Sequence, residues 1–253
     1  MGFWPVVNNI LKQSDLLVVV GDARMPEDSL NQEIIGKIEN LEKAYVIVFT
    51  KVDLVSKESL AKLKNKYRGA FFVSGTKNID VGLLRKHLII QAKKMKLPDL
   101  RVGIVGYPNI GKSALINALV RRARTLVADS PGTTKGTQWV KANGFLVLDT
   151  PGVIPFDDRH TKLGLLGAKS PDHMRNPEKV AFEIIRKILS SDKKTLLEHY
   201  NIDANISEMS IEEIFNEIGK KRGYLMKGGG IDEHRTAVAI VREWQRGKLR
   251  LDS

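Results

Sequence analysis

The sequence contains no cysteine among its 253 residues. That absence excludes disulfide bridges, cysteine-ligated zinc modules and a cysteine nucleophile. It also has no internal repeat or low-complexity tract, and no apolar run is long enough to cross a bilayer. Residues 1–5 lack the basic start and apolar stretch of a secretion signal. We therefore expect a soluble, cytoplasmic protein with no membrane partner.

Acidic residues are also scarce: 29 Asp and Glu stand against 41 Lys and Arg, which gives a formal net charge of +12. Such an excess favours a polyanionic partner, most often nucleic acid or an anionic membrane. No predicted helix combines a basic face with the exposed aromatic anchors of membrane-binding helices. The charge therefore favours nucleic acid, while a role in solubility alone stays open.

Short β-branched runs alternate with helical patterns up to about residue 120. The runs are apolar on both faces, as in buried strands of a parallel sheet. This alternation predicts a mainly parallel sheet that is covered by helices. Strands are predicted at 16–20, 45–49, 70–73, 102–105 and 145–148, and helices near 29–39, 56–67 and 80–96.

Amphipathic helices replace the strand pattern after about residue 160. One predicted helix begins at Pro177, and Ser210 with Glu213 forms a capping-box pattern at the start of another. A last helix is predicted over 232–246. The sequence therefore predicts an α/β domain over residues 1–165, followed by a smaller all-helical C-terminal domain over 166–253.

Residues 106–113 fit the phosphate-loop pattern G-x-x-x-x-G-K-[ST], between a predicted strand and a predicted helix. Glycines let backbone N–H groups face phosphate oxygens, and the helix N-terminus adds positive charge. Lys112 is expected to reach the β- and γ-phosphates, and Ser113 to ligate Mg²⁺. The nucleotide contacts expected here are Asn109, Ile110, Gly111, Lys112, Ser113 and Ala114.

A second acidic turn, residues 149–152, follows the predicted strand 145–148. Asp149 is expected to hold Mg²⁺ through water, and the Gly152 amide to contact the γ-phosphate. The polar segment before this strand supplies a further hydroxyl for Mg²⁺, and Thr134 is favoured over Thr133. The residues expected to act in catalysis are Asn109, Lys112, Thr134 and Gly152.

An earlier turn, Thr50 to Asp53, indicates which base is bound. An aspartate here can accept two hydrogen bonds from guanine, whereas adenine offers no matching donor pair. Lys51 would lay its aliphatic stem over the base. Together with the phosphate loop these turns predict GTP or GDP rather than ATP. The base-side contacts expected are Thr50, Lys51, Asp53, Ser74, Gly75 and Thr76.

The order of these motifs, with the base-reading turns ahead of the phosphate loop, resembles the circularly permuted translational GTPases. Within that family the chain is similar to the ribosome biogenesis GTPase A group. Residues 22–26 resemble that family's D-A-R-x-P turn, and residues 138–140 and 218–229 resemble its middle and C-terminal segments. The resemblance implies a circularly permuted P-loop GTPase fold.

The resemblance also implies a function. The chain is expected to hydrolyse GTP and to help assemble the large ribosomal subunit, as a monomer whose partners are that subunit or its precursor and ribosomal RNA. A small-subunit assembly GTPase is one alternative, although such proteins usually add an OB domain or a cysteine-rich zinc module. A nucleotide-sensing adaptor that hardly hydrolyses GTP is the other.

The chain departs from the family pattern at several positions. Thr50 replaces the usual Asn, which is expected to weaken a contact to guanine N7 and the support between loops. Residues 3–7 lack the family's proposed catalytic histidine. Val153 stands where Ras-like proteins orient water with Gln, and Asn109 stands where some relatives bind potassium. We therefore expect slow hydrolysis that potassium and ribosomal particles stimulate, with His160 more plausible as a solvated loop residue than as a catalytic group.

The basic residues form three clusters, and solvated helix faces would explain any one of them. The C-terminal cluster nevertheless makes ribosomal RNA the favoured target, which would be bound through phosphates and shape. The clusters are Lys220, Lys221, Arg222, Lys227, Arg235, Arg242, Arg246, Lys248 and Arg250; Arg85, Lys86, Lys93, Lys94 and Lys96; and Arg121, Arg122 and Arg124.

Overall fold

The computed structural model describes residues 4–120, 139–148, 160–191, 193–202 and 208–251. The chain folds as two compact units. The first holds residues 1–53 and 58–156, and the second holds residues 54–57 and 157–253. No helix in these described ranges has the length and apolar character needed to span a membrane.

The first unit is built on a six-stranded sheet with the strand order β3-β2-β1-β4-β6-β5. All neighbouring pairs are parallel except β5 and β6, which form an antiparallel pair. The five predicted strands and the mainly parallel α/β fold are confirmed. The strands are β1 (Leu16–Asp22), β2 (Ala44–Thr50), β3 (Phe71–Phe72), β4 (Leu100–Val105), β5 (Trp139–Ala142) and β6 (Phe145–Leu148).

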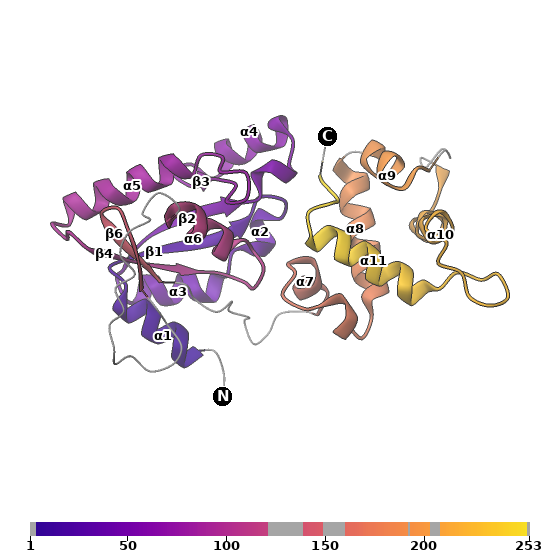
Figure 1. The fold of residues 1–253 in the computed structure, drawn as a ribbon, viewed down its shortest axis with the longest axis horizontal. Helices are drawn as coiled ribbons and strands as arrows, with labels where there is room; N and C mark the ends of the chain where they lie inside the picture. The colour runs from indigo at the N-terminus through magenta and orange to yellow at the C-terminus, as the bar shows by residue number, and fades with distance from the viewer. Residues whose placement is uncertain (1–3, 121–138, 149–159, 192, 203–207, 252–253) are drawn as a thin grey trace. The chain divides into compact units, whose positions relative to one another are not determined.

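Helices cover both faces of this sheet. In Figure 1, α5 and α6 lie on one face, and α1 and α3 lie on the other. Every residue of the central strand β1 is buried, as its apolar run predicted. The sequence did not predict α1 or the edge strand β5. The helices are α1 (Trp4–Gln13), α2 (Pro26–Ser29), α3 (Gln32–Asn40), α4 (Lys57–Lys66), α5 (Val81–Lys94) and α6 (Lys112–Val120).

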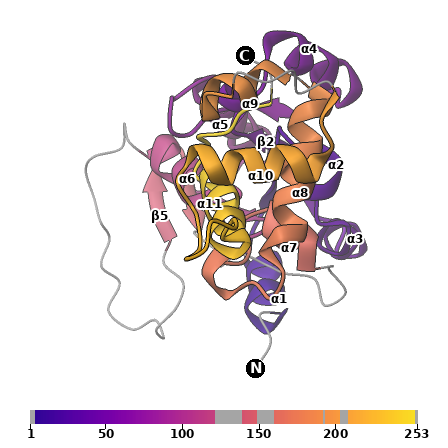
Figure 2. The same ribbon diagram turned by 90° about the vertical axis from the view of Figure 1, so that its right-hand side faces the viewer.

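The second unit is helical. Its longest helices, α8 and α11, pack against each other, and α10 crosses them (Figure 2). Ser210 and Glu213 form both hydrogen bonds of the predicted capping box. The helices are α7 (His160–Leu165), α8 (Pro177–Ser191), α9 (Lys193–Tyr200), α10 (Ile211–Lys221) and α11 (Glu233–Gln245).

The second unit begins earlier than the boundary at residue 165 that the helix pattern suggested. The reason is that α7 packs on α8 and α11. The buried Trp244 indole of α11 also donates a hydrogen bond to the Leu165 carbonyl oxygen at 2.9 Å. Because an indole N–H needs a partner when it is buried, this bond holds α7 within the helical unit.

One carboxylate joins three parts of the helical unit. Glu243 of α11 accepts hydrogen bonds from the Tyr200 hydroxyl at 2.8 Å and from the Arg222 guanidinium at 3.0 Å, and it lies 3.0 Å from His199 Nε2. Burial, together with this neighbouring carboxylate, raises the pKa of Tyr200 well above its ordinary value of 10.0. The tyrosine therefore stays a hydrogen-bond donor at neutral pH.

Candidate functional site

The turns singled out in the sequence follow adjacent parallel strands. β1 lies between β2 and β4, and the three strands end at the same edge of the sheet. The chain continues from β1 towards β2 on one side, and from β4 towards β6 on the other. Open α/β sheets bind ligands at such a switch point, outside the carboxyl ends of the strands.

The phosphate loop follows β4 and leads directly into α6. A Cβ at Gly106 would lie 2.7 Å from the Val20 carbonyl oxygen, so only glycine fits so close to β1. Asn109 and Gly111 have φ angles of 55° and 105°. These left-handed conformations curl the loop, and asparagine and glycine tolerate them better than other residues.

Lys112 lies inside this curl. Its side chain is buried, and its ammonium donates hydrogen bonds to the Tyr107 carbonyl oxygen at 2.6 Å and to the Gly106 carbonyl oxygen at 3.2 Å. Ser113 and Asn109, in contrast, are exposed. The loop thus places one ammonium and the N-terminus of α6 at the same point, a combination suited to a phosphate group.

Thr50, at the end of β2, connects the base-reading turn to the phosphate loop. Its buried hydroxyl lies 2.5 Å from the Ile110 carbonyl oxygen and 3.1 Å from the Gly21 carbonyl oxygen. The sequence led us to expect weaker support between these loops because threonine replaces asparagine. The threonine hydroxyl does reach the phosphate loop directly, and the strength of this contact relative to an asparagine contact stays a prediction.

The turn after β3 presses against α6. A Cβ at Gly75 would lie 2.6 Å from the carbonyl carbon of Ala114, so a larger residue would push the two backbones apart. Ser74 is buried, and its hydroxyl lies 3.2 Å from that of Thr76 and accepts the Lys77 N–H at 3.1 Å. The two predicted base-side turns therefore both contact the phosphate-loop region.

A buried carboxylate, Asp22, lies at the end of β1 beside the base-reading turn. The Arg24 guanidinium donates to both of its oxygens, from Nε at 3.1 Å and from Nη2 at 2.9 Å. The Lys51 ammonium lies 2.9 Å from Asp22 Oδ2. Burial alone would raise the pKa of Asp22, but the charges of Arg24 and Lys51 and their hydrogen bonds hold it far below its ordinary value.

The sequence predicted a contact between Lys51 and the guanine base. It did not predict the contact between the Lys51 ammonium and the Asp22 carboxylate. Lys51 has a φ of 60°, a conformation that lysine rarely adopts, and Asp22 holds its ammonium in place. Burial lowers the pKa of Lys51, and the charge of Asp22 partly opposes that effect. The D-A-R-M-P turn was the sequence signal that could have revealed this contact. Asp22 begins that turn, and it pairs with Thr50, the residue before Lys51, in the parallel register of β1 and β2.

The remaining predicted residues divide into two sets. Asp53 lies in the short 3-10 helix η1 (Val52–Leu54) and is half-buried. Thr134, Asp149 and Gly152 lie outside the described residues, as does Val153. Within the described part of the chain, no three His, Cys, Asp or Glu side chains gather into a metal-binding cluster.

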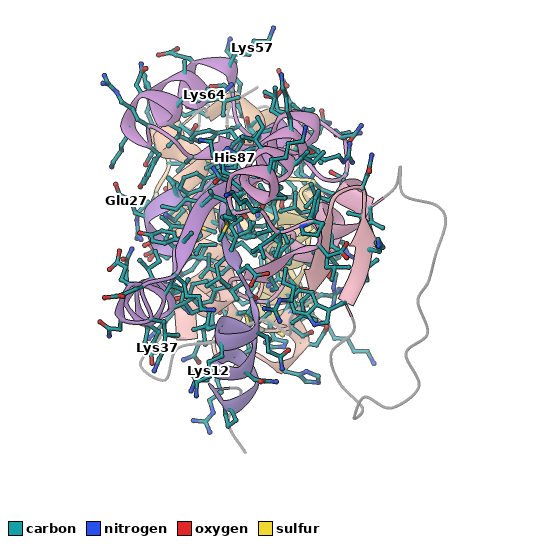
Figure 3. All side chains as sticks on the ribbon, turned by 90° about the vertical axis from the view of Figure 1, so that its left-hand side faces the viewer. Lys12, Glu27, Lys37, Lys57, Lys64 and His87 are labelled. Carbon is teal, nitrogen blue, oxygen red and sulfur yellow. The ribbon has the colours of Figure 1, made fainter. Side chains whose placement is uncertain are left out.

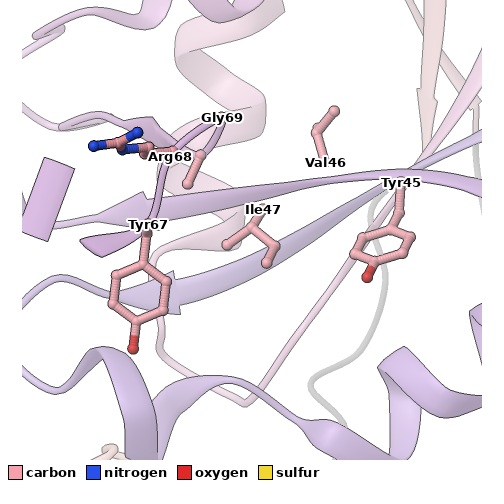
Figure 4. A pocket seen from close by; sticks show the side chains of 7 residues that line it. Tyr45, Val46, Ile47, Tyr67, Arg68 and Gly69 are labelled. Carbon is pink, nitrogen blue, oxygen red and sulfur yellow. The ribbon is translucent and has the colours of Figure 1, made fainter. Parts of the chain in front are cut away.

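A cavity of about 230 Å³ lies elsewhere in the first unit (Figure 4). It is formed at the beginning of β2 and by the loop before β3, whereas the turns described above follow the ends of the strands. The cavity is therefore separate from the candidate site. Its lining residues are Tyr45, Val46, Ile47, Tyr67, Arg68, Gly69 and Ala70.

We predict that Asp22→Asn lowers the free energy of unfolding at pH 7 by about 3 kcal/mol, because it leaves the buried Arg24 guanidinium and the partly buried Lys51 ammonium uncompensated. The depressed pKa in the folded state also means that the carboxylate stabilises the protein above its ordinary pKa of 3.8, and that this contribution is lost as the pH falls through the lower folded value. Urea unfolding between pH 7 and pH 2 should therefore show a shallower acid dependence in the variant.

The matched control is Asp99→Asn, which removes an exposed ion pair to Lys141 with an N–O distance of 3.4 Å. Such surface pairs contribute roughly 0–1 kcal/mol. Equal losses of stability in the two variants would contradict the role assigned to Asp22, which is to hold Arg24 and Lys51 in place.

Known proteins match both halves of the chain. A family model described as RsgA GTPase matches residues 6–158, and one described as 50S ribosome-binding GTPase matches residues 101–217. The second match begins just ahead of the phosphate loop. A family model in the usual motif order begins near the phosphate loop. In a circularly permuted chain, the match to such a model therefore begins in the middle of the sequence.

Individual relatives match over almost the whole chain. An uncharacterized GTP-binding protein of Methanocaldococcus jannaschii is 38% identical over 96% of the chain, which spans 65% of that protein's length. Ribosome biogenesis GTPase A of Bacillus cereus is 34% identical over 96% of the chain and 86% of its own length. A GDP-bound structure of YlqF from T. maritima is 25% identical with a TM-score of 0.66, covering 97% of this chain and 96% of that one.

The Bacillus cereus protein and the RsgA GTPase model both cover most of the described site, including β1, β2, the phosphate loop and α6. The motif order in the sequence and the convergence of the turns in the structure agree with these matches. The chain therefore belongs to the circularly permuted GTPase family that contains ribosome biogenesis GTPase A.

Proposed function

We propose that this circularly permuted GTPase uses GTP hydrolysis to help assemble the large ribosomal subunit. The observation that carries the proposal is the contact between the Thr50 hydroxyl and the Ile110 carbonyl oxygen, because it joins the base-reading turn to the phosphate loop. One guanine nucleotide can then contact both. The match to a family described as 50S ribosome-binding GTPase supports the choice of the large subunit.

In this proposal each turn has a separate task. Asp53 reads the guanine edge, with the amides of Ser74 to Thr76 beside it, and Lys51 supports the base while Asp22 holds its ammonium. Lys112 exchanges its two carbonyl contacts for β- and γ-phosphate oxygens. Gly152 would contact the γ-phosphate from a segment that lies outside the described residues.

The residues present fit a magnesium ion bound together with the nucleotide. Ser113 is exposed in the first turn of α6, next to Lys112, and its hydroxyl is the kind of ligand that a P-loop supplies to Mg²⁺. Thr134 and Asp149 would complete the site from outside the described residues. Bound there, the ion would neutralise charge that develops on the phosphates.

Potassium is the proposed source of further stimulation. Asn109 is exposed and has a φ of 55°, so this residue lies on the surface of the phosphate loop and not in the core. An oxygen in this position suits a hard monovalent cation close to the phosphates. The proposal also includes stimulation of GTP hydrolysis by ribosomal particles.

The basic side chains differ in how available they are for binding ribosomal RNA. On the first unit, Lys64 of α4 lies at the opposite end of the view from Lys12 of α1 and Lys37 of α3 (Figure 3). Arg85 donates to the Ala118 and Leu119 carbonyl oxygens at 2.6 and 3.0 Å, so it caps the end of α6. We propose the helical unit as the RNA-binding surface because it carries the C-terminal basic cluster.

We predict that Asp53→Ala lowers the affinity for GTP by roughly 100-fold or more, because two hydrogen bonds to a charged group are lost. Binding of ATP should stay weak, so that the preference for guanine disappears. Titration calorimetry with GDP and ADP would measure both affinities. The exposed Asp28→Ala is the control, and an unchanged preference for GDP in Asp53→Ala would contradict the base-reading role.

We predict that Asn109→Ala loses the part of the hydrolysis rate that depends on potassium rather than sodium. Because alanine also strains a left-handed position, Asn201→Ala at a φ of 52° in the helical unit is the matched control. Steady-state phosphate release in KCl and NaCl would measure the effect. Potassium stimulation that survives in Asn109→Ala would rule out this ligand.

The decisive experiment for the proposed function is co-sedimentation with isolated ribosomal subunits, loaded with a GTP analogue or with GDP. We expect the analogue-bound protein to sediment with the large subunit and to hydrolyse GTP faster in its presence. Sedimentation with the small subunit instead would favour a small-subunit assembly role. Nucleotide binding without measurable turnover, with or without subunits, would favour a nucleotide-sensing adaptor.

A further inference from the structure

A short hairpin connects α10 to α11 in the helical unit. Leu225 and Ile231 form an antiparallel bridge, and the Asp232 N–H donates to the Tyr224 carbonyl oxygen at 2.9 Å. Inside the turn, the Met226 N–H donates to the Gly230 carbonyl oxygen at 2.7 Å. These bonds give the hairpin, residues 224–231, a defined shape despite its three consecutive glycines.

The tip of this hairpin exposes two large apolar side chains. Leu225 is 51% exposed and Met226 is 58% exposed, whereas Ile218 and Trp244 of the flanking helices are almost completely buried. Burying such side chains is worth roughly 1.5–3 kcal/mol each, and a folded unit normally uses that free energy internally. Two consecutive apolar residues exposed on an ordered turn offer an apolar surface to a partner.

Exposed cations lie on the hairpin and at the ends of the two helices that it joins. Lys221, Lys227 and Arg235 are exposed, and the Arg235 guanidinium lies 4.6 Å from the centre of the Tyr224 ring. The nearby Asp232 accepts the Arg235 N–H at 2.9 Å as the cap of α11, so its carboxylate is occupied at the helix end. A hairpin that carries both exposed apolar side chains and positive charges is complementary to a polyanion that also offers an apolar surface.

We propose that the hairpin docks in the minor groove of double-helical ribosomal RNA, a proposal that rests on the ribosomal function above. Leu225 and Met226 carry no strong hydrogen-bonding groups and would pack on the sugars and base edges. The wide and shallow minor groove of A-form RNA admits such a tip, while its phosphates attract Lys221, Lys227 and Arg235.

Double-helical RNA fits this tip better than unpaired RNA does. Proteins that hold unpaired bases usually stack them on aromatic rings or on guanidinium planes. The two side chains at the tip are aliphatic. The aromatic ring of the hairpin, Tyr224, already has the guanidinium of Arg235 over it, 4.6 Å from its centre. The geometry therefore favours recognition by shape in a groove over base stacking.

The test uses the full-length protein and an RNA hairpin with about 16 base pairs, the length that a double-stranded RNA-binding domain spans. The double variant Leu225→Ser with Met226→Ser should bind this RNA roughly tenfold more weakly, with an unchanged salt dependence. The double variant Lys227→Ala with Arg235→Ala should instead reduce the slope of log K against log salt by roughly two. Leu83→Ser is the matched control, because Leu83 on α5 is 59% exposed.

Three results would overturn the proposal. The first is unchanged affinity of the apolar variant for the double-helical probe. The second is tighter binding of a single-stranded RNA of the same composition that depends on Leu225 and Met226. The third is a loss of binding to intact large subunits without any loss on protein-free RNA, which would indicate a ribosomal protein as the partner.

The proposed function fails separately from this inference. If the unmodified protein does not sediment with large subunits, the ribosomal function is wrong whatever the hairpin does. If it sediments and the apolar variant sediments equally well, only the hairpin proposal is wrong. GTP hydrolysis without RNA should be the same in all of these variants, which shows that each one is folded.

Discussion

A buried hydroxyl joins the two halves of the candidate nucleotide site. Thr50 Oγ1 and the Ile110 carbonyl oxygen are separated by 60 positions in the chain and lie 2.5 Å apart. The contact ties the end of β2 to the phosphate loop, and it is buried, so water does not compete for it. The distance from Asp53 to the phosphate loop, and hence the fit of one nucleotide, depends on this junction.

The ion pairs of Asp22 beside this junction fix the directions of its partner side chains more than they add to the free energy of unfolding. Burying Asp22 with two cations costs desolvation that their attraction offsets only when the geometry is good. Here the carboxylate makes paired contacts with Arg24 and a further contact with Lys51, so every partner is fixed in direction. The chain thereby holds a lysine in a left-handed conformation at the mouth of the candidate site.

Charge has different tasks in different parts of the molecule. Arg85 caps α6, Arg222 pairs with Glu243, and Arg242 pairs with Asp172 at 2.6 Å, so each stabilises its own unit. A net charge of +12 does not separate such residues from those that face a partner. On the hairpin after α10, exposed cations and exposed apolar side chains occur together.

The sequence by itself determined the buried strands, the capping box at Ser210, the phosphate loop and the permuted motif order, because these depend on local periodicity and spacing. Only the tertiary structure decided that Thr50 bonds to Ile110, that Asp22 holds Lys51 and that Gly75 must be small. Each of these contacts joins segments that follow parallel strands ending at the same edge of the sheet. Residues far apart in the chain meet there, and no local pattern records which side chains will touch.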